Sequence, residues 1–178
     1  PYVSGTGSPM YYTARIAKQK YPNAKVVFIG PCIAKRKEAQ RDECVDYVLT
    51  FEELHPMFRG LGIELEQANP YKVAYESVCE AHGFAQAGGV AGAVKAYLGP
   101  KANGIKIMQF SDFTKKNIGV LRAYAKTGKV DAQFIEMMAC EGGCVTGPSA
   151  HNDPVAGKRQ LNQDLLKRTL KYENNNQE

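Results

Sequence analysis

The sequence lacks any long apolar run. None of its segments approaches the roughly 20 consecutive apolar residues that a membrane-spanning helix needs, and we expect no membrane association. The first residues, Pro1–Gly5, carry neither positive charge nor an apolar signal core, so nothing in them indicates secretion. They also lack a starting methionine, and we expect the 178 residues to be a piece of a longer protein.

Dense positive charge is missing as well. Lysine and arginine total 23 against 18 aspartates and glutamates, a net charge of +5, but the longest unbroken basic run is Lys35–Lys37. A nucleic-acid-binding surface needs clustered positive charge, so we expect no nucleic-acid partner. The composition, 44% hydrophobic and 23% charged, is typical of a globular protein and excludes a mostly disordered chain.

The number of cysteines is odd. Five cysteines do not suit a closed disulfide framework. Cysteines in a chain of this size and composition indicate a reducing compartment, where thiols serve metal binding or reactive chemistry. We therefore expect a cytoplasmic protein.

Short apolar runs alternate with helical patterns along the chain. The run at 25–29 is continuous, which is typical of a parallel strand buried on both faces. Ser8 and Thr50 stand where helix N-caps are expected, and Glu53 completes a capping box with Thr50. The alternation predicts an α/β fold, a largely parallel sheet flanked by helices, in one domain over 1–172 with a disordered tail at 173–178. Strands are expected at 25–29, 47–49, 106–110 and 134–138, and helices at 9–18, 51–59, 77–98, 112–126 and 155–172.

Two cysteine-bearing loops, at 30–38 and 136–147, follow predicted strands. Ligands of open α/β sheets bind at the carboxyl ends of the strands, which makes both loops candidate sites. Cys140 and Cys144 form a C-x-x-x-C pair in the second loop. Gly142 and Gly143 between them allow the backbone to wrap closely around an inorganic ligand.

The first loop adds Cys32 and, three residues later, Lys35, which would bring positive charge to an anionic centre. A metal centre is the favoured reading of the two loops, although the C-x-x-x-C cysteines could also be small buried hydrophobes. Zinc is the alternative metal, but zinc sites usually contain more closely spaced C-x-x-C pairs. The only histidine near these cysteines in the sequence is His151. We interpret His151 as a loop residue, and Cys44 and Cys79 as structural thiols.

The second loop resembles the third signature of the iron-only (FeFe) hydrogenase large subunit, E-x-M-A-C-x-G-G-C-x-x-G. The first loop resembles the family's second signature, M-P-C-T-x-K-K-x-E. The segment Gly88–Val90 resembles a third stretch, G-G-V, although Gly88 and Gly89 could serve helix packing alone. The matching residues of the two signatures are Pro31, Cys32, Lys35 and Glu38 in the first loop, and Glu136, Met138, Ala139, Cys140, Gly142, Gly143, Cys144 and Gly147 in the second.

The resemblance implies the C-terminal part of an H-cluster domain. The H-cluster joins a four-iron cubane (4Fe-4S) to a two-iron unit, and it interconverts hydrogen with two protons and two electrons. On this resemblance Cys32 and Cys140 would bind the cubane, and Cys144 would bridge it to the two-iron unit. Lys35 would hydrogen-bond an iron-bound cyanide and Met138 would pack beside the two-iron unit, as the catalytic residues. Gly142 and Gly143 would line the cofactor.

The departures from the family pattern are informative. The first signature, which carries another cubane cysteine, has no counterpart here, so three of the four cubane ligands are present. The resemblance therefore implies an upstream part of the same chain as a partner, and a ferredoxin-like electron carrier. Gly30, Ile33 and Arg36 replace the family's methionine, threonine and second lysine, as in its divergent, sensory branch.

Three functions follow as alternatives. The first is a piece of a hydrogenase-like protein, catalytic or hydrogen-sensing, which alone would hold no cluster and show no activity. The second is an iron–sulfur assembly relative without the two-iron unit. The third is a cluster-free α/β binding module. Lys35 and Met138, which would serve the two-iron unit, favour the first.

Overall fold

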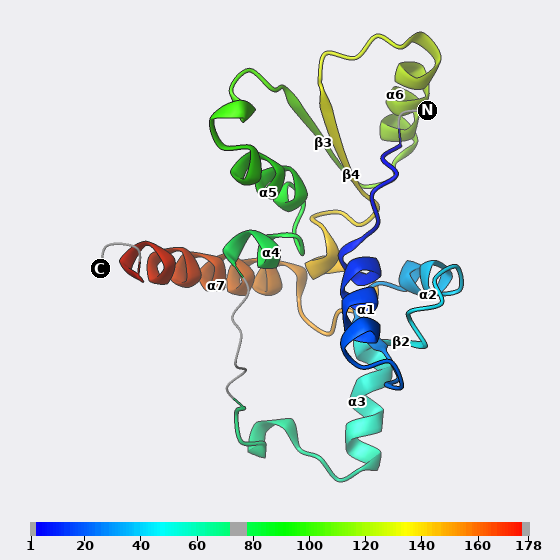
Figure 1. Ribbon diagram of the computed structural model, residues 1–178, viewed down its shortest axis with the longest axis vertical. Coiled ribbons are helices and arrows are strands. Elements are labelled where there is room, and N and C mark those ends of the chain that lie inside the picture. The colour runs from blue at the N-terminus through cyan, green and yellow to red at the C-terminus, as the bar shows by residue number, and fades with distance from the viewer. Residues whose placement is uncertain (1–2, 72–77, 176–178) are drawn as a thin grey trace. The chain divides into compact units, whose positions relative to one another are not determined.

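The computed structural model describes residues 3–71 and 78–175, with side chains up to residue 168 (Figure 1). The chain divides into two compact units. The first consists of Pro1–Pro70 together with Pro148–His151, and the second of Tyr71–Gly147 together with Asn152–Glu178. In the described part of the chain, no helix has both the length and the apolar character to cross a membrane.

The first unit is built around a parallel strand pair. The pairing of β1 with β2 runs in register from Val27 opposite Tyr47 to Gly30 opposite Thr50, and it confirms both strands predicted in this half. The elements in chain order are α1 (Pro9–Lys20), β1 (Val27–Gly30), α2 (Ala34–Ala39), β2 (Tyr47–Thr50), α3 (Phe51–Gly60) and a 3-10 helix at Leu65–Gln67.

Local capping sets the starts of α1 and α3, as the sequence predicts. The Ser8 side chain accepts a hydrogen bond from the Tyr11 backbone N–H at 3.3 Å, and proline follows Ser8 at the first helical position of α1. At α3 the Glu53 carboxylate accepts the Thr50 backbone N–H at 2.8 Å, while the Thr50 hydroxyl accepts the Glu53 N–H at 3.3 Å. The predicted capping box is therefore confirmed.

The core of the first unit covers one face of its sheet. Met10, Ala14 and Val45 are buried, and Phe28 packs against them from β1. Val27 and Ile29, which point to the opposite face, are each 43% exposed. The expectation that this strand is buried on both faces is wrong within the unit, because its core packs against alternate side chains only.

Asp46 joins three elements ahead of the first cysteine loop. Its carboxylate accepts hydrogen bonds from Lys18 of α1 at 2.7 Å, from the Val26 backbone N–H at 2.8 Å and from Lys25 at 3.1 Å. These bonds, that from Lys18 foremost, hold the pKa of Asp46 well below its usual range. The start of β1, which leads to Cys32, is thereby fixed to α1.

The second unit contains the other parallel pair. In Figure 1, β3 and β4 lie side by side, in register from Ile107 opposite Phe134 to Ser111 opposite Met138. Both predicted strands and the α/β class are confirmed, with short parallel sheets. The elements are α4 (Cys79–Gly83), α5 (Gly89–Leu98), β3 (Ile107–Ser111), α6 (Lys115–Thr127), β4 (Phe134–Met138) and α7 (Pro154–Asn175), with 3-10 helices at Gly99–Ala102 and Cys144–Thr146.

Three helices differ from the prediction. The expected helix at 77–98 is two helices, because Gly88 adopts a left-handed conformation with φ of 88° between α4 and α5; Ser77 lies outside the described residues. Helix α6 begins later than expected, at Lys115, because Thr114 caps it. Helix α7 runs to Asn175, three residues past its expected end, and residues 176–178 of the expected tail lie outside the described residues. The single domain over 1–172 stays a prediction.

Candidate metal centre

The second cysteine loop leaves the carboxyl end of β4 and turns back on itself at once. Cys140 and Cys144, both partly buried, lie on this turn. The Gly143 N–H donates to the Cys140 carbonyl at 3.0 Å, and the Gly147 N–H donates to the Cys144 carbonyl at 2.9 Å. The Thr146 hydroxyl donates to the Gly143 carbonyl at 3.0 Å. The two thiol-bearing residues thus lie four residues apart on a hydrogen-bonded turn.

The two glycines between the cysteines are required by conformation and by space. Gly142 has φ of 83° and Gly143 has φ of 99°, which side chains rarely adopt. A Cβ on Gly143 would collide with the backbone of Gln86 and Ala87. The Ala87 N–H donates to the Gly142 carbonyl at 3.1 Å. The glycines therefore let the loop pack directly against the segment that precedes α5.

A hydroxyl at the end of β3 holds the same loop. The Ser111 hydroxyl accepts the Gly142 backbone N–H at 2.6 Å. Ser111 is the last residue of β3 and pairs in register with Met138, the last residue of β4. Sequence reasoning did not single out Ser111, although a polar residue that ends an apolar strand is a usable signal for a residue at the ligand-binding edge.

Glu136 has a structural role that the sequence did not reveal. It lies in β4, is 5% exposed, and its carboxylate accepts the backbone N–H groups of Gly88 and Ala91 at 2.7 Å each. Gly88 offers no side chain to cap α5, so the carboxylate from β4 replaces the missing cap. Negative charge at a helix N-terminus is favourable. A Cβ on Gly89 would also collide with the Gly83 carbonyl, so this glycine pair does serve helix packing.

The first cysteine segment is only partly a loop. β1 ends at Gly30 and Cys32 is partly buried, but α2 begins at Ala34, which corrects the loop expected over 30–38. The sequence gives little sign of this helix because it is a six-residue element without a side-chain cap.

The two basic side chains that the second signature specifies, Lys35 and Arg36, both have acidic partners. The Lys35 ammonium pairs with the Glu38 carboxylate at 2.5 Å, and Glu38 also accepts a hydrogen bond from the Ser8 hydroxyl. Burial alone would raise the pKa of Glu38, but the hydrogen bonds from Lys35 and Ser8 outweigh it and lower this pKa below its usual range. Arg36 pairs with Glu53 of α3 at 2.6 Å.

The short segment Pro148–His151, which follows the second cysteine loop in the chain, contacts the first cysteine loop. The Ser149 N–H donates to the Pro31 carbonyl at 3.3 Å, and Ser149 is 3% exposed. The ring of His151, in the same short segment, lies 5.7 Å from the ring of His55 in α3. Both contacts lie within the first unit, to which the short segment Pro148–His151 belongs.

Comparison with known proteins decides the family. The family described as "Iron only hydrogenase large subunit, C-terminal domain" matches residues 1–148. The chain belongs to this family. It is also 34% identical over 80 residues to the cytosolic Fe-S cluster assembly factor NAR1 of Kluyveromyces lactis, a match that covers 43% of the chain and 16% of NAR1.

Solved hydrogenases share the fold of this family member. An apo variant of the FeFe-hydrogenase HydA1 from Chlamydomonas reinhardtii superimposes with a TM-score of 0.63 at 19% identity, over 93% of this chain and 60% of that one. A structure of HydA(deltaEFG), which concerns stepwise H-cluster assembly, gives a TM-score of 0.61 at 21% identity and the same coverages. The chain thus spans about three-fifths of these hydrogenases and a smaller part of NAR1.

The predicted site residues of this hydrogenase-family chain fall in both units. Met138, Cys140, Gly142, Gly143 and Cys144 belong to the second unit, and Cys32 and Lys35 to the first. Over residues 3–71 and 78–175, no three His, Cys, Asp or Glu side chains are gathered in a way that could hold a metal. The three-cysteine site therefore stays a prediction. Cys44 packs against the core of the first unit, which agrees with a structural thiol.

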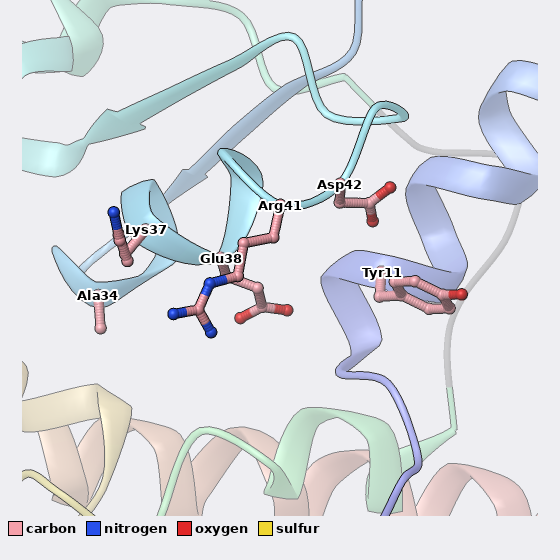
Figure 2. A pocket seen from close by; sticks show the side chains of 6 residues that line it. All are labelled: Tyr11, Ala34, Lys37, Glu38, Arg41 and Asp42. Atoms are coloured by element: carbon pink, nitrogen blue, oxygen red, sulfur yellow. The ribbon is translucent and has the colours of Figure 1, made fainter.

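A pocket of about 490 Å³ borders the helix that follows Cys32 (Figure 2). Asp42, at its edge, is 7% exposed, and its Oδ1 accepts the Cys44 N–H at 3.0 Å. Its Oδ2 has no hydrogen-bond partner among the described residues. The pocket thus adjoins the Glu38 that pairs with Lys35. It is lined by Tyr11, Ala34, Lys37, Glu38, Arg41 and Asp42.

Proposed function

We propose that this chain supplies three cysteine ligands, Cys32, Cys140 and Cys144, to the iron–sulfur cluster of a hydrogenase-like protein. The observation that carries the proposal is the turn after β4, on which two thiol-bearing residues flank a pair of left-handed glycines. The fourth cubane ligand then comes from another part of the longer protein, because a cubane takes four cysteines.

The residues present fit such a cluster in two respects. Thiolates are soft ligands, which suit iron–sulfur clusters. The loop is held from three sides, by the Ser111 hydroxyl, by the segment before α5 and by its own turn, so ordering it on cluster binding costs little. Ser149, five residues after Cys144 in the chain, donates to the carbonyl of Pro31, the neighbour of Cys32, which favours including Cys32 among the proposed ligands.

Two further side chains act on the bound group in this proposal. Lys35, three residues after Cys32, would donate a hydrogen bond to an acceptor on the two-iron unit, and its ammonium is paired with the Glu38 carboxylate. Met138, the last residue of β4, would cover the two-iron unit with an apolar, polarizable side chain. When bound, the H-cluster supplies the reversible interconversion of hydrogen with protons and electrons.

The function we propose for the full-length protein is hydrogen oxidation or proton reduction, or hydrogen sensing with the same site. Gly30 in place of the family's methionine loosens the packing around the two-iron unit, and Ile33 in place of threonine removes a hydroxyl, which favours slow turnover or sensing. The partners would be the upstream part of the chain and a ferredoxin-like electron carrier, in the cytoplasm.

Iron–sulfur assembly is the second candidate function. It is favoured by the 34% identity to the cytosolic assembly factor NAR1, which exceeds the identity to the solved hydrogenases. An assembly factor would need the cubane cysteines, but it would leave Lys35 and Met138 without a two-iron partner.

An infrared spectrum distinguishes the two candidates. The full-length protein, purified without oxygen after expression with hydrogenase maturation enzymes, should show carbonyl and cyanide bands if it holds a two-iron unit. Lys35→Met should shift the cyanide bands, while the exposed neighbour Lys37→Met should not. Iron and sulfide without these bands would favour the assembly function, and neither iron nor sulfide would leave a cluster-free binding module.

A further inference from the structure

The start of α7 is fixed to the second cysteine loop. The Asp153 carboxylate caps the helix by accepting the Ala156 N–H at 2.9 Å, and the Asn152 side-chain amide donates to the Val145 carbonyl at 3.4 Å. Gly157 is buried, and a Cβ there would collide with the Asn152 side chain. The first turn of α7 therefore has a set position against the 3-10 turn that contains Cys144.

The next residue, Lys158, reaches from α7 to the glycine pair. A Cβ built on Gly142 would collide with the Cε and Nζ atoms of Lys158, so the ammonium occupies the space that a side chain at Gly142 would fill. Gly142 lies two residues from Cys140 and two from Cys144, and two residues span at most about 7 Å. A positive charge is thus held close to both cysteines.

Among the described residues, no carboxylate forms an ion pair with this ammonium. The Lys158 side chain is partly buried, and the ion pairs of the described residues do not include it. Lys158 also lies beyond residue 148, where the family match ends, so the family's signatures do not specify it. Its neighbour Arg159, on the same turn of α7, is exposed.

We propose that Lys158 supplies a fixed positive charge to the cluster site. Its ammonium, held against Gly142, stabilises the negative charge of a cluster bound by Cys140 and Cys144. The proposal rests on the proposed function, because it needs a bound cluster. A cubane with thiolate ligands is anionic and becomes more negative when it accepts an electron, so a fixed nearby cation favours the reduced form. Gly142 is then needed twice, for its φ of 83° and for the room that it leaves to Lys158.

The test is the midpoint potential of the cubane in the full-length protein reconstituted with ferrous iron and sulfide. Dithionite, through mediators, supplies the one electron, and the reduced cluster is counted by electron paramagnetic resonance. We expect Lys158→Gln to lower the reduced-to-oxidised ratio at a fixed potential roughly ten-fold, which is about 59 mV for one electron. Lys158→Met, which keeps an apolar stem, should do the same, and Lys158→Arg should keep most of the wild-type potential.

Arg159→Gln is the matched control, since it removes one positive charge from the exposed face of the same turn. It should change the midpoint potential by only a small fraction of the shift that Lys158→Gln causes. Loss of the cluster from the Gln and Met variants, with the Arg variant still loaded, would also support the role of the charge. Equal potentials in all four variants, with equal iron content, would overturn this inference and leave the proposed function intact. A wild-type protein that takes up no cluster would overturn both.

Discussion

The cap that Glu136 provides for α5 yields a sharp prediction. Its carboxylate accepts two backbone N–H groups at 2.7 Å each and is 5% exposed. Hydrogen bonds to charged groups contribute about 1.5–3 kcal/mol each, so Glu136→Ala should lower the free energy of unfolding by about 3–6 kcal/mol. Glu136→Gln retains one acceptor oxygen and should cost about half as much, because one N–H then loses its partner.

Amide hydrogen exchange locates this effect. In the wild-type chain the amides of Gly88 and Ala91 should exchange slowly, and both Glu136 variants should accelerate them by more than they accelerate α6. Glu141→Gln is the control, because Glu141 lies in the same signature with an exposed side chain. If Glu136→Ala left both amides as protected as in the wild type, the carboxylate would not hold α5, and its burial would need another explanation.

Three further predictions concern the supports of the two loops. The pKa of Asp46 is lowered in the folded state, so its carboxylate stabilises the fold fully above the unfolded pKa of about 3.9 and loses this effect as the pH falls toward the folded pKa. Asp46→Asn should therefore reduce the decline of the urea unfolding midpoint in acid. Gly143→Ala should destabilise more than Gly104→Ala, by thermal unfolding, because both glycines have positive φ but only Gly143 faces backbone where a Cβ would stand; equal losses would mean that strain alone matters. Thr50→Ala should cost about 1 kcal/mol by urea unfolding through the lost cap of α3, and an unchanged midpoint would contradict the capping box.

Local signals in the sequence predicted most elements correctly. The four strands are short apolar runs, and Thr50 and Glu53 specify the start of α3 through contacts three residues apart. The turn after β4 also follows from local chemistry, because the two glycines at 142 and 143 permit conformations that other residues resist.

The errors arise where distant residues decide. The break between α4 and α5 depends on Glu136, 48 residues away from Gly88, and no local pattern contains that contact. The open face of β1 could not be inferred either, because Val27 and Ile29 are as apolar as Phe28, which is partly buried against the core. The position of Lys158 could not be predicted for the same reason, since its place against Gly142 depends on how α7 packs on the loop.

The central claim, that Cys32, Cys140 and Cys144 ligate one iron–sulfur cluster, is tested most directly by iron content. The full-length protein, reconstituted anaerobically with ferrous iron and sulfide, should lose most of its cubane iron when any one of the three is changed to serine. Cys44→Ser, in the core of the first unit, should bind as much iron as the wild type. Full iron content in the Cys140→Ser and Cys144→Ser variants would contradict the claim.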